Sequence, residues 1–105
     1  MENLKYCLLN NLDGVYYVEE GDTLDSIAKK FTTSKRLIII DNNLTSDIEV
    51  GDALYVKRYN KVYVVGVVDT PESVANNLGI TVEETYKINK TNYVFPFMEV
   101  VSSKD

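Results

Sequence analysis

The sequence lacks histidine and tryptophan, and Cys7 is its single cysteine among 105 residues. Without histidine, neither a Ser-His-Asp triad nor a Cys-His pair can form within one chain. With one cysteine, the chain can form neither an internal disulfide nor a metal site made of cysteines alone. We therefore expect no catalytic residues, no metal site and no cofactor, and we interpret Cys7 as a buried or incidental thiol.

Carboxylates are the remaining route to catalysis, and adjacent acids occur at Glu19-Glu20 and at Glu83-Glu84. Neighbouring side chains diverge in direction on a strand or a helix, whereas glycoside hydrolysis needs two carboxyl groups at a defined separation across a cleft. Both pairs fall where turns and helix starts favour solvated charge. We therefore expect that the protein is not an enzyme.

Positive charge and long apolar runs are also scarce. The net charge of −5 divides into −3 for residues 1–58 and −2 for residues 59–105, so neither half has the basic surface typical of nucleic-acid binding. The apolar patch at residues 6–9 is shorter than the core of a signal peptide, and no segment approaches the length of a membrane span. We expect no nucleic-acid partner, no membrane partner and a chain that is cytoplasmic as synthesised.

The sequence does contain an internal repeat. Residues 16–28 (YYVEEGDTLDSIA) return 47 positions later as residues 63–75 (YVVGVVDTPESVA). The same offset pairs Asn42 with Asn89, and a one-residue deletion aligns residues 51–54 with residues 97–100. These matches predict a unit of about 40 to 45 residues that is present twice. Because 105 residues leave little room for two separate cores, we expect the units to pack on each other.

Each repeat predicts a strand, two short helices and a closing strand. Residues 15–18 and 53–56 are rich in β-branched and aromatic residues, which is typical of strands. Thr23 and Ser34 are suitable N-caps for a first helix and for a second helix over residues 35–41. In the second repeat, Thr70 with Pro71 at the first helical position, and Thr81, have the same function.

The fold class that follows is α+β, with a two-stranded antiparallel sheet and two short helices in each unit. The repeated asparagines, Asn42 and Asn89, fall at the end of the second helix of each unit. Their amides are suited to ending that helix or to binding loop backbone. We therefore interpret both as structural residues.

The spacing of the first unit resembles the LysM (lysin motif) domain. The residues that carry the resemblance are Tyr16-x-Val18-x-x-Gly21-Asp22-Thr23-Leu24-x-x-Ile27-Ala28-x-x-Phe31, then Ile38-x-x-x-Asn42-x-Leu44, then Ile48-x-x-Gly51-x-x-Leu54. The second unit departs from the pattern, with Val68 before Asp69-Thr70, Pro71 after it, and Phe97 in place of the late glycine. We interpret residues 15–57 as a first LysM domain and residues 61–103 as a second, degenerate one. Residues 1–14 are either an arm or an extra strand, with residues 4–9 forming a hairpin through a loop at residues 10–14.

The resemblance implies a function as well as a fold. LysM domains are non-catalytic modules that bind the N-acetylglucosamine chains of peptidoglycan in bacterial cell walls, and of chitin. They bind in a groove between the first strand–helix loop and the second helix–strand loop. On this chain, the resemblance indicates carbohydrate-binding residues in those loops: Gly21, Asp22, Thr23, Leu24, Asn43, Leu44, Thr45, Ser46, Asp47 and Ile48.

Several of these residues also have purely structural interpretations. Gly21 is suited to a positive φ, Thr23 to capping the helix, and Leu44 and Ile48 to filling the core. In the second unit, Val68 and Phe97 replace bare backbone with side chains, which disfavours sugar binding in the same manner.

The alternative function is a structural or assembly protein that uses the LysM fold for protein–protein contacts, for instance in a spore layer or a phage-like particle. The missing export signal favours this alternative, and the intact sequence of residues 21–24 favours glycan binding. The chain would then be associated with a spore, a wall or a particle. A partner protein or a homodimer would use an apolar surface that includes Leu37, Ile39, Ile40 and Phe97.

Overall fold

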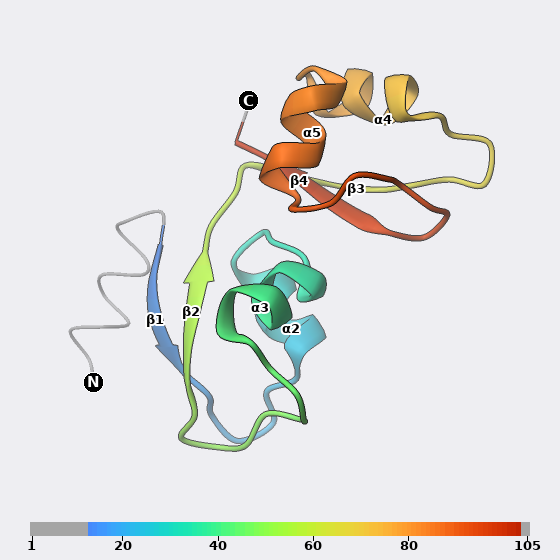
Figure 1. Cartoon of the computed structure of the whole chain (residues 1–105). Helices are drawn as coiled ribbons and strands as arrows, with labels where there is room; N and C mark the ends of the chain where they lie inside the picture. The colour runs from blue at the N-terminus through green and yellow to red at the C-terminus, as the bar shows by residue number, and fades with distance from the viewer. Residues whose placement is uncertain (1–12, 104–105) are drawn as a thin grey trace. The chain divides into compact units, whose positions relative to one another are not determined.

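The computed structural model describes residues 13–103 and divides the chain into two compact units, with the boundary between Arg58 and Tyr59. The elements of the first unit are β1 (Asp13–Tyr17), α2 (Leu24–Lys30), α3 (Lys35–Asn42) and β2 (Ala53–Lys57) (Figure 1). Those of the second are β3 (Lys61–Val64), α4 (Pro71–Leu78), α5 (Val82–Ile88) and β4 (Glu99–Ser102). The α+β class and the element order are confirmed, and none of these helices is long and apolar enough to span a membrane. The packing of one unit on the other stays a prediction.

Within residues 13–103, each unit has one two-stranded antiparallel sheet, in which β1 pairs with β2 and β3 with β4. Asp13 and Gly14, which the sequence predicts to lie in a loop at residues 10–14, instead belong to β1 and lie opposite Lys57 and Val56. That prediction was wrong because the longer ladder satisfies backbone groups that a turn would leave to water. The predicted hairpin over residues 4–9 and the thiol of Cys7 lie outside the described residues.

The helices begin where the threonine and serine caps predict. Thr23 Oγ1 accepts a hydrogen bond from the Ser26 amide at 3.0 Å, and the Thr23 amide donates to Ser26 Oγ at 2.9 Å. This reciprocal pair satisfies two amides that the first turn of α2 leaves without helical partners. Ser34 caps α3, Thr81 caps α5, and Thr70 caps α4 with proline in the first turn.

The core of the first unit lies between its sheet and its two helices. The hydroxyl-bearing ring of Tyr16 packs edge-on against Phe31, with ring centroids 5.3 Å apart. The partly buried side chains of Leu24, Leu44 and Ile48 pack against this core, so the core interpretation of Leu44 and Ile48 is confirmed. The buried members are Tyr16, Val18, Ile27, Ala28, Phe31, Ile38, Leu54 and Val56.

Asn42 and Asn89 connect the second helix of each unit to its closing strand. Asn42 Nδ2 donates to the carbonyls of Ile38 and Tyr55, and Asn42 Oδ1 accepts from the Tyr55 amide at 2.7 Å. Asn89 makes the same three bonds, to the Thr85 carbonyl and to the amide and carbonyl of Val101. The structural role predicted for both asparagines is confirmed, although their partners lie in the helix and in the closing strand rather than in a loop.

The second unit has a smaller core, made of Val65, Val74, Leu78, Met98 and Val100. Phe97, at the edge of this unit, has a φ of 71° and donates its amide to the Val65 carbonyl at 2.7 Å. Its counterpart in the first unit is Gly51, with a φ of 95° and an amide that donates to the Val18 carbonyl at 2.8 Å. A phenylalanine therefore occupies a left-handed conformation that glycine adopts more readily.

Replacing this residue, Phe97→Gly, should raise the free energy of unfolding of the second unit by about 0.5–1 kcal/mol. The left-handed strain is relieved, and little burial is lost because the side chain is 75% exposed. Urea unfolding, followed by amide hydrogen exchange in β3 and β4, measures the change. The control is Phe95→Gly at an exposed neighbour whose φ is not positive, where we expect no gain. Equal stabilisation by both variants would show that strain at Phe97 is not the cause.

Candidate functional site

Two loops leave the same end of the first unit, one between β1 and α2 (residues 18–23) and one between α3 and β2 (residues 43–52) (Figure 1). Backbone hydrogen bonds join their bases. The Val18 amide donates to the Asp52 carbonyl at 2.9 Å, and the Gly51 amide donates to the Val18 carbonyl at 2.8 Å. These bonds thus fix the start of the first loop and the end of the second.

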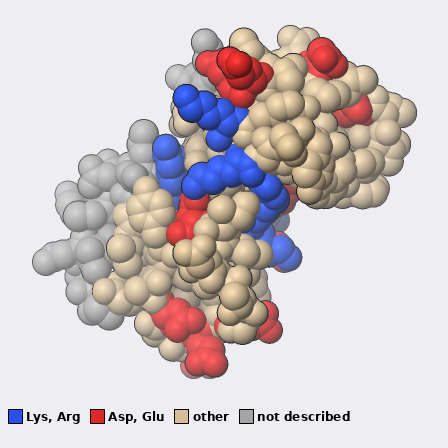
Figure 2. Space-filling model, in the orientation of Figure 1, with Lys and Arg blue, Asp and Glu red and all other residues tan. Residues whose placement is uncertain are grey.

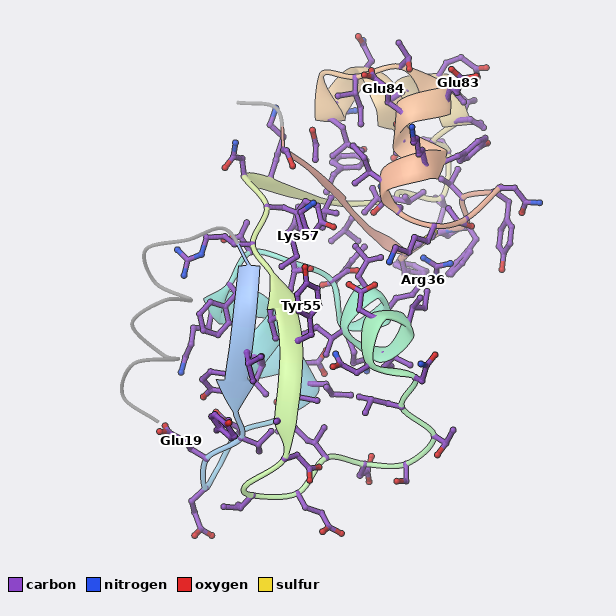
Figure 3. All side chains as sticks on the ribbon, turned by 60° about the vertical axis from the view of Figure 1, so that its left-hand side comes forward. Glu19, Arg36, Tyr55, Lys57, Glu83 and Glu84 are labelled. Atoms are coloured by element: carbon purple, nitrogen blue, oxygen red, sulfur yellow. The ribbon has the colours of Figure 1, made fainter. Side chains whose placement is uncertain are left out.

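The first loop turns at Gly21 and is closed by Asp22. Asp22 Oδ2 accepts from the Glu19 amide at 2.8 Å and from the Tyr16 hydroxyl at 2.7 Å. Gly21 has a φ of 87°, and a Cβ placed there would meet no atom within 4 Å, so the turn requires glycine for its conformation and not for space. The structural interpretation of Gly21 is therefore confirmed. Figure 3 shows Glu19 at this end of the unit, with Tyr55 and Lys57 further along β2.

The Tyr16 hydroxyl is a stable donor in this arrangement. Burial is the main cause that raises the pKa of Tyr16 above its ordinary value, and the hydrogen bond to Asp22 raises it further. The hydroxyl therefore stays protonated and continues to donate to Asp22 throughout the neutral range. The interaction joins the loop to the core, since Tyr16 is buried and Asp22 is half-buried.

A cleft of about 360 Å³ opens between the loops. Of the ten residues that the sequence indicates, the cleft is lined by Asp22, Thr23, Leu24, Asp47 and Ile48. Asn43 ends α3 in a left-handed conformation, and Leu44 packs against the core. Gly21, Thr45 and Ser46 are exposed in the loops without lining the cleft.

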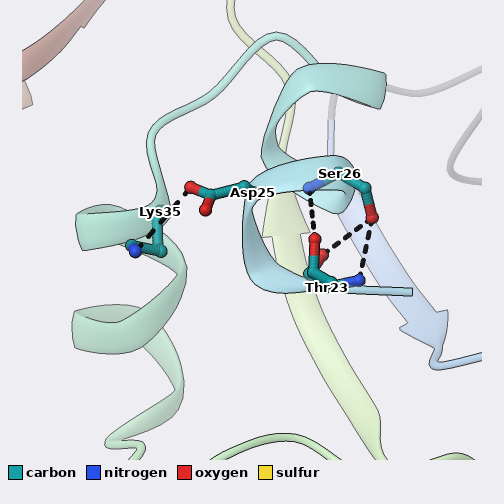
Figure 4. A network of polar contacts seen from close by, with 4 residues as sticks. All are labelled: Thr23, Asp25, Ser26 and Lys35. Carbon is teal, nitrogen blue, oxygen red and sulfur yellow. Dashed lines mark hydrogen bonds and ion pairs between the residues drawn. The ribbon is translucent and has the colours of Figure 1, made fainter. Parts of the chain in front are cut away.

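Two further lining residues, Asp25 and Lys35, were missed by the sequence reasoning. They lie in the first turns of α2 and α3, and Lys35 Nζ is 3.7 Å from Asp25 Oδ1 (Figure 4). In the sequence, Asp25 and Lys35 each have the pattern of an ordinary surface charge on a helix. Only the packing of α2 beside α3 brings the two side chains together. An exposed ion pair of this kind contributes little to the stability of the fold. Its relevance here is that both charges lie in the wall of the cleft.

The loop end of the first unit is acidic. Loop residues 18–23 and 43–52 contain no lysine or arginine, and their acids are Glu19, Glu20, Asp22, Asp47, Glu49 and Asp52. Figure 2 shows Asp and Glu atoms gathered at this end, in the orientation of Figure 1. Lys35 is the one base among the described residues that line the cleft, and it is paired with Asp25.

The lining combines hydroxyl and carboxylate groups with the half-buried apolar side chains of Leu24 and Ile48. Such a surface suits a ligand that has polar groups on its edges and apolar faces, since buried polar groups fix orientation while apolar contacts supply area. Within residues 13–103, no group of three or more histidine, cysteine or acidic side chains is arranged to bind a metal ion.

The second unit repeats the hydrogen-bonded framework of the first loop but not the loop surface. Asp69 Oδ2 accepts from the Tyr63 hydroxyl at 2.6 Å and from the Gly66 amide at 2.7 Å, as Asp22 does from its counterparts. The adjoining residues Val67 and Val68 are strongly exposed. A hollow of about 580 Å³ runs along α4 and the start of α5, and Thr70, Ser73 and Thr81 are among its lining residues.

The hydrogen bonds to Asp69 predict a dependence of stability on pH. The Ser73 hydroxyl is the main cause that lowers the pKa of Asp69, followed by the Tyr63 hydroxyl and the Gly66 amide. The stabilisation is therefore present above the unfolded-state pKa of about 3.9 and is lost as the pH falls through the lower folded value. In Asp69→Asn, this acid-dependent part of the second unit's stability should vanish, which urea midpoints between about pH 2 and pH 6 measure. An unchanged pH profile in the variant would contradict the assignment.

The comparison with known protein families gives a match within the first unit. The family model of the LysM domain matches residues 16–57. This LysM match runs from β1 to the last residue of β2 and includes both cleft loops. No curated protein matches the chain.

Two solved structures align with most of the chain. They are the spore cortex-lytic enzymes SleL of Bacillus megaterium QM B1551 and of Bacillus cereus, at 24% and 21% identity with TM-scores of 0.42 and 0.43. The alignments cover 86% and 89% of this chain but only 22% and 23% of those enzymes. The chain thus spans less than a quarter of the length of either enzyme.

Proposed function

We propose that the first unit binds chains of N-acetylglucosamine, from peptidoglycan or a chitin-like polymer, in the cleft between its two loops, and that it does so without catalysing a reaction. The observation that carries the proposal is the LysM match over residues 16–57, in a unit whose two loops enclose a cleft. The bound polymer would be part of a bacterial cell wall or a spore layer.

The cleft offers the contacts that such a sugar needs. Polar groups of residues 22–24 and 47–48, which line the cleft, bind acetamide and hydroxyl groups, and the half-buried side chains of Leu24 and Ile48 cover the apolar faces of the rings. Thr23 and Asp47, both exposed at the cleft, add polar partners. The other indicated residues shape the loops and do not line the cleft: Gly21, Asn43, Leu44, Thr45 and Ser46.

The second unit, residues 61–103, is on this account a degenerate LysM domain and forms a tandem pair with residues 15–57. The three amide bonds of Asn89, the bonds to Asp69 and the left-handed Phe97 all support common descent, because each has an equivalent in the first unit. Exposed valines at 67 and 68 and the side chain of Phe97 occupy the positions of the cleft loops. We therefore assign glycan binding to the first unit alone.

A second candidate function is assembly through protein contacts, and the apolar end of the second unit favours it. Val67, Val68, Tyr93 and Phe97 are each more than half exposed. A partner or a second copy of the chain would cover these side chains. In the first unit, Ile39 and Ile40 are available for such contacts, whereas Leu37 is buried.

Calorimetric titration with N-acetylglucosamine oligomers tests the glycan proposal. We expect saturable binding that Thr23→Arg weakens at least about tenfold, because the new side chain fills the cleft and blocks the contacts that orient the sugar. The matched control is Thr70→Arg, which removes the same kind of helix cap from the second unit. Equal losses in both variants would overturn the placement of the site, and heats equal to dilution for the wild-type protein would overturn the proposal.

A further inference from the structure

We propose that the cleft selects glycans by charge, favouring partly N-deacetylated chains that bear free amines and disfavouring chains that bear carboxylates. This inference rests on the proposed glycan-binding function and specifies its substrate class. The observation behind it is the composition of the cleft wall, in which three carboxylates, those of Asp22, Asp25 and Asp47, face a single lysine.

The three carboxylates are not equally neutralised. Asp25 is paired with Lys35 at 3.7 Å, so these two charges largely cancel. Asp22 accepts a hydrogen bond from the Tyr16 hydroxyl, and Lys30 Nζ lies 3.3 Å from the same hydroxyl. The positive charge of Lys30 therefore partly offsets the negative charge of Asp22 from the core side. Lys30 does not line the cleft.

Asp47 is the carboxylate that remains for a ligand. Its side chain is exposed, and it makes no hydrogen bond or ion pair with any residue in the range 13–103. The acids of the same loops add to its field, since neither loop contains a base. An ammonium group on the sugar would be attracted at this position, and a carboxylate would be repelled.

The other bases in the described part of the first unit do not line the cleft. In the sheet register, Lys57 pairs with Asp13 at the end opposite the loops, which depart after the pair of Tyr17 and Ala53. The Arg58 guanidinium lies 5.3 Å from the centre of the Phe31 ring. The first unit is therefore polarised, with its acidic end at the cleft.

The expected discrimination is modest and sensitive to salt. One exposed charge pair alters an affinity by about two- to fivefold at low ionic strength. The Debye length falls from about 30 Å at 0.01 M to about 3 Å at 1 M salt, so screening should abolish most of the effect. The glycans also differ in their acetamide contacts, whose contribution to affinity depends little on salt. The salt dependence of the affinity therefore separates the effect of charge from the effect of these contacts.

The experiment measures the affinity of the whole chain for three tetrasaccharides at about 0.01 M and about 1 M salt. The probes are the N-acetylglucosamine tetramer, the same tetramer with one residue deacetylated, and an alternating N-acetylglucosamine and N-acetylmuramic acid tetramer. On adding salt, we expect the amine-bearing probe to weaken two- to fivefold, the carboxylate-bearing probe to tighten, and the neutral probe to change little. Asp47→Asn should reduce both salt effects, whereas Glu83→Gln, which removes one acid from the second unit, should leave them unchanged.

Two kinds of failure are distinct. If the probes bind with one common salt dependence, or if Asp47→Asn leaves the salt effects unchanged, charge selection is overturned while glycan binding stands. If none of the three probes binds at either salt concentration, glycan binding by this chain is overturned and the selectivity with it.

Discussion

Asn89→Ala should lower the free energy of unfolding of the second unit by about 3 kcal/mol. The amide of Asn89 is buried and makes three hydrogen bonds, to the Thr85 carbonyl and to the amide and carbonyl of Val101. Alanine would leave these backbone groups without partners in a region that water does not reach, because Val101 is fully buried. Each unsatisfied buried group costs about 1–3 kcal/mol, so the effect should exceed that of most single substitutions.

The equivalent change in the first unit, Asn42→Ala, is the control. It removes the same three bonds, but Tyr55 is 41% exposed and Asn42 only partly buried, so water can replace much of what is lost. We expect a loss of about 1 kcal/mol. Urea unfolding with amide hydrogen exchange resolved by unit measures both. If the two variants lose the same stability, burial is not what makes Asn89 important.

Ile27→Ala should lower the free energy of unfolding of the first unit by about 3 kcal/mol, within a usual range of about 2–5. Ile27 is fully buried among the side chains that join α2 to the sheet. Its truncation removes apolar contact and leaves a cavity, which a core of this size has few neighbouring side chains to fill. The loss should also lower the population of the folded cleft near the denaturation midpoint.

The control for this substitution is Val50→Ala in the second cleft loop, where the side chain is 64% exposed and the expected change is below about 0.5 kcal/mol. Circular dichroism with hydrogen exchange at β1 and β2 amides gives the difference between the variants. A loss at Ile27 no larger than that at Val50 would contradict the assigned core.

The helix starts could be predicted from the sequence because their signals are local. Thr23, Ser34, Thr70 and Thr81 each cap a helix through bonds that span three residues. Residues 38–40 are three isoleucines, a run that on its own is typical of a strand, but they lie in α3, which Ser34 caps. Local capping therefore outweighed intrinsic strand preference there.

The start of β1 and the lining of the cleft could not be predicted, because both depend on contacts between residues that are distant in the sequence. The pairing of Asp13 with Lys57 is set across the sheet, so the start of β1 could not be found from its own residues. The Asp25–Lys35 pair arises only when α2 and α3 pack, and no local motif marks it. Of the ten indicated binding residues, the sequence could not separate Ile48, which lines the cleft, from Leu44, which packs on the core without lining it.

The most direct test of glycan binding is a titration of isotope-labelled protein with the N-acetylglucosamine tetramer, followed by amide chemical shifts. We expect saturable shifts concentrated at residues 22–25, at Lys35 and at residues 47–48, which line the cleft. Shifts confined to residues 63–102 would contradict the placement of the site in the first unit. An unchanged spectrum at saturating tetramer would contradict glycan binding and favour assembly through the exposed apolar end of the second unit.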